Sequence, residues 1–255
     1  MHSVDELFEI VVRERDDDAR WIAIHALHAL GTREVLERAA QLCRSATAAE
    51  RVTGAEILGQ LKSFTGEARQ LLIAMLDDGD AAVVEAVIHA LGQQMVQQQD
   101  QYSIDALARV AQHQAPNVRW AVATALEDLI GDERAERVLL ALMRDADTSV
   151  RDRATFAVGS LSGHDTPRIR AALAERLRDE DRSVANEAAL GLARRRDARA
   201  IHYIAEAVLS ADGEIEEAAD EITSPDMLTE LLKARDATGG ATGLETLIQR
   251  CRARL

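Results

Sequence analysis

A unit of 31 to 35 residues recurs along most of this chain, and that repeat restricts the fold more than any other feature. It is clearest over residues 118–181, where two copies lie end to end. Each copy reads Val-Arg, an amphipathic stretch rich in Ala and Leu, a turn containing Gly, a second amphipathic stretch and an Asp-rich step. Because a unit of this size cannot bury an apolar face by itself, we expect successive copies to stack.

The Arg of the Val-Arg pair sets the register of the copies, and we call its position the marker. Equivalent positions are Arg20, Arg51, Val84, Arg119, Arg151, Ala185 and Glu216. Three and seven residues after the marker, the side chains are small or apolar in almost every copy. Offsets of three and seven lie on one face of a helix, so this face of each first helix is predicted to be buried.

An Asp stands four residues before the marker in most copies. These residues are Asp16, Asp80, Asp147, Asp181 and Asp212. A carboxylate there is well placed to cap the first helix, because it can accept backbone N–H bonds at the positive end of the helix dipole. We expect the same carboxylates to reach the marker Arg of their own or the next copy, which would form a structural Asp/Arg ladder.

Several stretches depart from the repeat. The Gln-rich segment 93–101 is predicted to protrude as a loop, and Pro225 is predicted to lie in the first turn of a helix. Recurring glycines such as Gly59, Gly92 and Gly159 are assigned to turns and helix ends. An amphipathic helix at residues 4–15 and an apolar stripe from Leu244 to Leu255 are expected to close the two ends.

Composition agrees with stacked helices. Apolar residues make up 47% of the chain and aromatic residues 3%, so the core must be built from Ala, Leu, Val and Ile. Cys43 and Cys251 are the only cysteines and form no disulfide framework. The first 18 residues lack the basic and apolar regions of a signal peptide, and no stretch is apolar enough to span a membrane. We therefore expect a cytoplasmic protein. We also expect a monomer.

The repeat resembles the HEAT-repeat family, and more narrowly the short bacterial HEAT-like repeats of phycobilin lyases. The resemblance covers residues 16–236 and is strongest at residues 145–161 and 179–201. It implies an all-α fold: a right-handed α-solenoid, or α-α superhelix, of about seven helix-turn-helix repeats. We expect one domain over residues 1–255, with a capping helix at 1–15, repeats at 16–236 and a second capping helix at 241–255.

The histidines do not follow a metal-binding pattern. His25 and His28 are three residues apart, and His89 occupies the position of His25 in the third copy, with Glu56 at that position between them. Deoxyhypusine hydroxylases, which are HEAT-repeat enzymes, hold two irons with repeated His-Glu dipeptides, and this chain has none. No nucleophile–base pair, phosphate loop or Cys-x-x-Cys motif occurs either. We expect a protein that is not an enzyme and has no cofactor and no metal ion.

Two surfaces are candidates for binding. Trp21 and Trp120 each follow a marker position, next to a stripe of His25, Glu56, His89, Thr124 and Phe156. The tryptophans either pack over a neighbouring helix or form a recognition strip, since Trp is enriched among interface hot spots. The second helices, starting near Thr32, Phe64, Ser103, Asp132, Thr166, Asp197 and Asp226, are expected to line a concave surface. Its candidate residues are Arg38, Arg69, Arg109, Arg137, Arg170 and Tyr203.

The charge pattern argues against nucleic acid. The net charge is −14, and the Arg-rich groups at residues 168–182 and 194–199 alternate with acidic side chains, as in ion pairs on a helix surface. The acid-rich segment 212–221 has no compensating base and is either solvated surface or a region that steers a basic partner.

The sequence thus predicts a non-enzymatic scaffold or adaptor that binds a protein partner on its concave surface, with an acidic inhibitor or immunity-type protein as a more specific form. A phycobilin-lyase-like protein that handles a tetrapyrrole is the alternative, although the tyrosines and tryptophans are widely separated. A HEAT-like DNA glycosylase is a third hypothesis.

Overall fold

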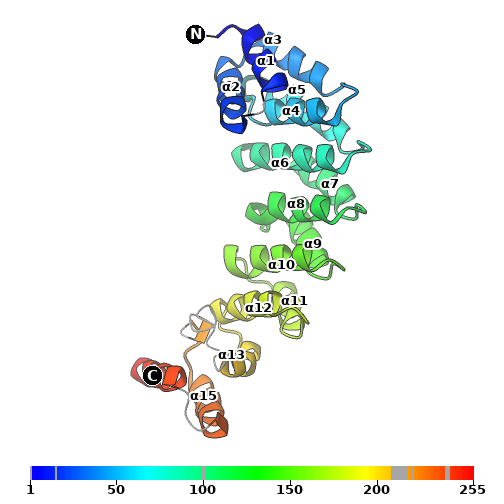
Figure 1. Ribbon diagram of the computed structural model, residues 1–255. Helices are drawn as coiled ribbons and strands as arrows, with labels where there is room; N and C mark the ends of the chain where they lie inside the picture. The colour runs from blue at the N-terminus through cyan, green and yellow to red at the C-terminus, as the bar shows by residue number, and fades with distance from the viewer. Residues whose placement is uncertain (1, 15, 99–100, 208–217, 220, 239–241) are drawn as a thin grey trace. The chain divides into compact units, whose positions relative to one another are not determined.

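The computed structural model is helical in every element that it describes (Figure 1). It describes residues 2–14, 16–98, 101–207, 218–219, 221–238 and 242–255. The chain divides into two compact units, Met1–Leu129 and Ile130–Leu255, here called unit one and unit two. The expected all-α repeat fold is confirmed within each unit, and the expectation of a single continuous domain stays a prediction.

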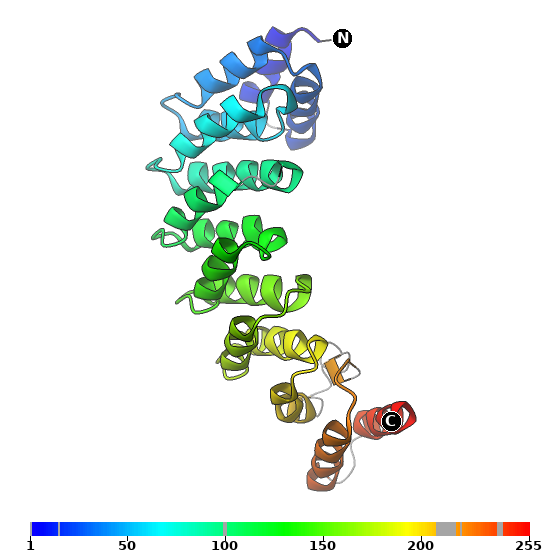
Figure 2. The ribbon, with the colours of Figure 1, turned by 180° about the vertical axis from the view of Figure 1, so that it is seen from behind.

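Unit one begins with the capping helix α1 and continues with alternating first and second helices of the repeats. Its elements are α1 (Val4–Arg13), α2 (Asp17–Leu30), α3 (Arg33–Leu42), α4 (Ala48–Gly59), η1 (Lys62–Phe64), α5 (Thr65–Met75), α6 (Ala81–Gln98), α7 (Gln101–Val110), α8 (Pro116–Leu126) and η2 (Glu127–Leu129). The first helices α4, α6 and α8 form one layer, and the second helices α5 and α7 form a second layer packed against it (Figures 1 and 2).

Unit two continues the same alternation. Its elements are α9 (Glu133–Leu142), α10 (Thr148–Phe156), the π-helix η3 (Ala157–Leu161), α11 (Pro167–Arg176), α12 (Arg182–Arg194), η4 (Ala198–Ala200), α13 (Ile201–Ala207), α15 (Pro225–Thr238) and α16 (Thr242–Arg254). The seventh copy is described mainly by its second helix, α15, which starts at the predicted Pro225. Most of the acid-rich segment 212–221 lies outside the described residues.

The predicted core face of the first helices is buried. Leu27, Leu58, Leu91 and Leu126, all seven residues after a marker, are 0% exposed. The residues three positions after the marker, Ala23, Gly54, Val87 and Val122, are buried as well. Within unit one, α4 packs against α6, and α6 packs against α8. Burying each such Leu contributes about 1.5–3 kcal/mol of transfer free energy to folding.

The predicted Asp caps are confirmed where the structure describes them. Asp16, Asp80, Asp147 and Asp181 each accept a backbone N–H from two residues further along. Asp212 lies outside the described residues. The prediction that these caps also bind the marker Arg is wrong for Arg51 and Arg151, because the cap carboxylates are turned to the helix backbone. Each of these two Arg residues instead binds the Asp that stands two residues before the cap of the next copy.

Arg51 shows how this joint between repeats is made. Its Nε and Nη2 donate to the two carboxylate oxygens of Asp78 at 2.8 and 2.9 Å. Its Nη1 donates to the carbonyls of Ser45 and Ala46, in the turn before its own helix, at 3.0 and 3.2 Å. One guanidinium thus ties the turn of one repeat to the turn of the next, and we call this arrangement the marker joint.

The same joint recurs in unit two. Arg151 donates to Asp179 at 3.0 Å through both Nε and Nη2, and to the carbonyls of Asp145 and Ala146. The ion pair is nearly buried, with side-chain exposures of 8% and 3%. The Arg151 guanidinium holds the pKa of Asp179 below its usual value even though burial opposes the shift. A buried pair that also satisfies backbone carbonyls fixes the spacing of the turns.

Two local expectations are wrong. The first concerns the Gln-rich segment, which does not form a loop from residue 93, because α6 continues to Gln98. Gln is a good helix former, and no Pro or Gly interrupts the helix after Gly92. Gln94 is buried and donates to the carbonyl of Leu58 at 3.0 Å. Residues 99–100 lie outside the described ranges. The second concerns Gly92, which lies within α6 rather than in a turn or at a helix end and allows close approach to Ala125. Gly59 is the last residue of α4, as expected, and allows close approach to Ala90.

The closing helices largely follow the prediction. Leu7, Phe8 and Val11 of α1 are buried, while Val12 is exposed. On α16 the apolar stripe is buried, apart from its last member, Leu255.

A candidate binding groove on the first helices

One face of the first helices in unit one carries polar and aromatic side chains. It consists of the residues one, five and nine positions after each marker, which fall on one side of a helix because they are four residues apart. The members are Trp21, His25 and Ala29; Val52, Glu56 and Gln60; Glu85, His89 and Gln93; and Trp120, Thr124 and Asp128. We call this surface the first-helix face.

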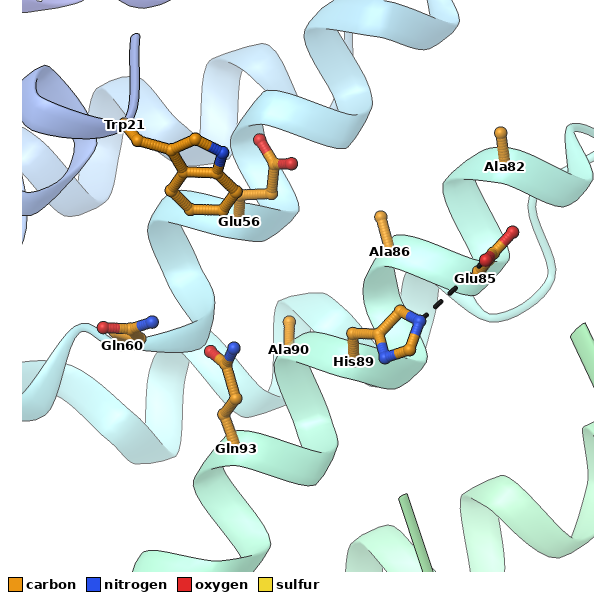
Figure 3. A pocket seen from close by; sticks show the side chains of 9 residues that line it. All are labelled: Trp21, Glu56, Gln60, Ala82, Glu85, Ala86, His89, Ala90 and Gln93. Carbon is orange, nitrogen blue, oxygen red and sulfur yellow. Dashed lines mark ion pairs between the residues drawn. The ribbon is translucent and has the colours of Figure 1, made fainter. Parts of the chain in front are cut away.

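The first-helix face is hollowed between α2, α4 and α6 (Figure 3). The hollow has a volume of about 430 Å³ and is called here the Trp21 groove. It is lined by Trp21, Glu56, Gln60, Ala82, Glu85, Ala86, His89, Ala90 and Gln93. The structure thus brings together Trp21, Glu56 and His89, three residues that the sequence placed on one edge.

Alanines and glutamines shape the rest of the groove. Ala82, Ala86 and Ala90 line it along α6, and their small side chains leave the space open. Gln60, just after the end of α4, and Gln93, within α6, both line the groove (Figure 3). The sequence reasoning missed these glutamines, although their common position nine residues after the marker is a signal that could have found them.

Trp21 is an exposed part of the lining. Its residue is 39% exposed, which is high for so large an apolar side chain. The guanidinium of Arg20 lies 5.7 Å from the indole centroid, and the His25 ring centroid lies 6.1 Å away. Trp120 is half-buried on α8 and does not line the Trp21 groove.

Two carboxylates in the groove lie in different surroundings. Glu56 forms an ion pair with Arg20, and both side chains are less than one fifth exposed. Burial raises the pKa of Glu56, and the Arg20 charge opposes that shift. Glu85 accepts a hydrogen bond from the Asn117 amide at 2.5 Å, and its Oε1 lies 3.9 Å from His89 Nε2. Glu85 has no Arg or Lys partner in the part of the chain that the structure describes.

A smaller hollow of about 200 Å³ continues the groove toward α8. It shares His89 and Gln93 with the Trp21 groove, and its other lining residues are Gly92, Thr124, Ala125, Glu127 and Asp128. Neither hollow has an Arg or Lys among its lining residues, whereas together they contain four carboxylates. The first-helix face therefore has an acidic, partly apolar channel running across successive helices.

His28 supports α2 against α4 close to the groove. Its Nε2 lies 3.0 Å from the carbonyl of Ile57, so this nitrogen donates and carries the proton of a neutral ring. Burial lowers the pKa of His28, which favours the neutral form. The ring meets His25 edge-on at a centroid distance of 6.0 Å.

Two of the second-helix candidates are held within the fold. The Arg38 guanidinium lies 4.3 Å from the Phe8 ring centroid and 2.5 Å from an Asp5 oxygen, so it fixes α1. Arg170 binds Asp165 at 2.6 Å and Asp197 at 3.2 Å.

The remaining second-helix candidates lie on separate helices. Arg69 is half-buried on α5, and Arg109 and Arg137 are exposed on α7 and α9. Tyr203 on α13 donates its hydroxyl to Asn186 at 2.7 Å. It also lines a hollow of about 570 Å³ in unit two, whose wall carries both acidic and basic side chains. A partner surface on the second helices stays a prediction.

Two kinds of feature are absent from the described residues. No group of three or more His, Cys, Asp or Glu side chains in these ranges is arranged to hold a metal ion. Within the same ranges, no helix combines the length and the apolar character needed to cross a bilayer.

Comparison with known proteins shows the same repeat architecture. A family model described as HEAT repeats matches residues 4–92, 70–159 and 136–223. Protein YibA of Escherichia coli strain K12 is 27% identical over 206 residues, which cover 78% of this chain and 72% of YibA. The X-ray structure of YibA is similar over 98% of this chain and 93% of that chain, with a TM-score of 0.75 and 25% identity.

A more distant similarity concerns the fold alone. The crystal structure of importin beta matches 97% of this chain and 42% of its own length, with a TM-score of 0.69 and 10% identity. The family match extends from residue 4 to residue 223. It agrees with the buried core face and with the alternation of first and second helices. This chain belongs to the HEAT-repeat family.

Proposed function

We propose that this protein is a non-enzymatic scaffold that binds a protein partner, and that the partner occupies the Trp21 groove. The observation that carries the proposal is an exposed Trp beside a hollow of about 430 Å³ on the surface of a repeat scaffold. Buried aromatic anchors supply much of the energy of protein interfaces, and an exposed Trp in a concave setting is suited to become one.

The shape of the first-helix face favours an elongated partner segment. The groove continues from α2 to α8 through the smaller hollow, which shares two lining residues with it. A segment laid across the helices would contact each repeat in turn, as expected for a scaffold whose surface is extended rather than enclosed. HEAT-like repeat folds are commonly protein-binding, which supports a partner of this class.

A photo-cross-linking experiment tests the proposal in cells. Ala86, which lines the groove, is replaced by p-benzoylphenylalanine, and in a matched variant the same residue replaces Gln70, which is exposed on the second helix α5. We expect a covalent adduct with a discrete protein from position 86 and not from position 70. The adduct should disappear when Trp21→Ala is added, because the anchor is then lost.

Thermal unfolding of each variant, followed by circular dichroism, provides the control for folding. Equal adducts from positions 86 and 70, or an adduct from position 86 that persists in the Trp21→Ala background, would contradict a partner held in the groove.

A further inference from the structure

We infer that the Trp21 groove takes an extended basic peptide segment whose Arg or Lys side chains enter between the Trp21 ring and the carboxylates of Glu56 and Glu85. The inference rests on the proposed function and adds the chemistry of the partner. It follows from three features of the described residues: the charge of the lining, the exposed indole and the spacing of the amide side chains.

The lining attracts cations. The two adjacent hollows contain Glu56, Glu85, Glu127 and Asp128, and neither has an Arg or Lys lining residue. Glu56 is ion-paired with Arg20, so Glu85 is the carboxylate on which the attraction mainly depends. Glu85 is neighboured by an amide and an imidazole rather than by a guanidinium or ammonium group. Carboxylates that lack a cationic neighbour bind an incoming Arg through charge-assisted hydrogen bonds, which are about twice as strong as neutral ones.

Trp21 adds a second means of recognising a cation. An indole ring attracts guanidinium and ammonium groups within about 6 Å of its centroid, and it does so best when water is excluded. Arg20 lies 5.7 Å from this ring and is ion-paired with Glu56, so its own positive charge is balanced beside the hollow. The Trp21 ring and the Glu85 carboxylate both line the hollow, so basic side chains of a partner meet both kinds of group there, whereas an acidic partner would meet repulsion.

Gln60 and Gln93 indicate an extended backbone. Each side chain offers an amide donor and a carbonyl acceptor, which match the N–H and C=O groups of a peptide that forms no internal hydrogen bonds. The two residues share the position nine residues after the marker in neighbouring copies, Gln60 at the end of α4 and Gln93 within α6. Packed helices lie ~8–10 Å apart, and three residues of polyproline-like chain cover about 9 Å, so one helix corresponds to three peptide residues.

The probe follows from that spacing. It is a fluorescein-labelled nonapeptide with Arg at every third position and Ala or Pro between, and its control has citrulline in place of each Arg. Citrulline keeps the planar shape of the side chain and removes the charge. Binding to the full-length protein is measured by fluorescence anisotropy at about 50 mM salt, where exposed charges are weakly screened.

We expect the Arg peptide to bind about tenfold more tightly than the citrulline peptide, which corresponds to the range of a partly desolvated cation–π contact with an added ion pair. Glu85→Gln and Trp21→Ala should each weaken binding severalfold. Glu37→Gln, which removes one acidic charge from the exposed surface of α3, should change the affinity less than twofold. Circular dichroism confirms that each variant is folded, and Glu85→Gln keeps the size of the side chain.

Equal binding of the Arg and citrulline peptides would overturn the inference. So would an equal loss of affinity in Glu37→Gln and Glu85→Gln, because the peptide would then respond only to the net charge. If position 86 forms its adduct but the Arg peptide fails these tests, the proposed function stands and the basic partner is wrong. If the Arg peptide passes but no adduct forms in cells, the groove recognises basic peptides and the proposed scaffold function is contradicted.

Discussion

Arg195 is a buried cation whose described hydrogen bonds go to backbone carbonyls rather than to a carboxylate. Its guanidinium donates at 2.7–3.1 Å to the carbonyls of Val158, Gly159, Ser162, His164 and Gly191. Three of these residues lie within or just after the π-helix η3, where the regular i to i−4 bonding is interrupted. Burial lowers the pKa of Arg195. Its role in the fold is to donate to several buried backbone carbonyls at once.

We expect Arg195→Met to reduce the free energy of unfolding by about 2–4 kcal/mol, because several buried acceptors lose their donors at once while the packing volume is roughly kept. Arg178→Met, which changes an exposed Arg in the same unit, should cost less than about 0.5 kcal/mol. Urea denaturation of both variants measures the difference. Similar losses in the two variants would show that the carbonyl bonds of Arg195 contribute little.

His28 should make stability depend on pH. Its pKa in the folded state lies below the ordinary value of 6.5, so the unfolded state takes up a proton first as the pH falls. The stabilisation is complete above about pH 6.5 and is lost as the pH drops through that value toward the folded pKa. The free energy of unfolding should therefore fall between pH 7 and pH 5, and less steeply in His28→Gln. Denaturant titrations at these two pH values test this, and parallel profiles would refute it.

At the scale of elements, the contact between α12 and the π-helix η3 depends on two glycines. A Cβ at position 191 would lie 2.5 Å from the Cα of Gly159, whereas a Cβ at position 163 would have no neighbour within 4 Å. Backbone atoms cannot give way as the end of a flexible side chain can. The two elements must then separate or shift to accommodate even one methyl group.

Gly191→Ala is accordingly expected to destabilise the protein by about 2 kcal/mol, despite the better helix propensity of Ala. Gly163→Ala should be close to neutral because it meets open space. Thermal unfolding by calorimetry compares the two. A stabilised Gly191→Ala variant would mean that the helix pair adjusts without loss.

Sequence periodicity predicted which helix faces are buried, and Leu27 and Leu58 illustrate why, since burial follows directly from position on a helix. It also placed Trp21 beside Glu56. It could not give the bonds of Arg51, because the choice between Asp78 and Asp80 depends on where a turn points each carboxylate. The π-helix had no sequence signal either, since a shift from i−4 to i−5 bonding leaves the apolar pattern almost unchanged.

For the whole molecule, the net charge of −14 determines how partners approach. Unit one contains the acidic channel and the unbalanced carboxylate of Glu85. Long-range attraction of a basic segment affects the rate of association more than the rate of dissociation, and salt screens it over about 10 Å at 0.1 M.

We therefore expect the association rate constant of the Arg peptide to fall by about tenfold between 50 and 300 mM NaCl, with a smaller change in its dissociation rate constant. Stopped-flow fluorescence measures both constants, and the citrulline peptide serves as the uncharged reference. An association rate that does not respond to salt would indicate that the net charge plays no part in the encounter.

The marker joint also bears on how such a chain can grow. Arg51 and Arg151 each belong to one copy, and their partners Asp78 and Asp179 belong to the turn that opens the next. A segment that runs from one Asp turn to the next carries one Arg and one Asp, which are the two complementary halves of a junction. Duplicating that segment in frame would create a complete junction at each new boundary, so the protein could gain or lose whole copies without inventing a new interface.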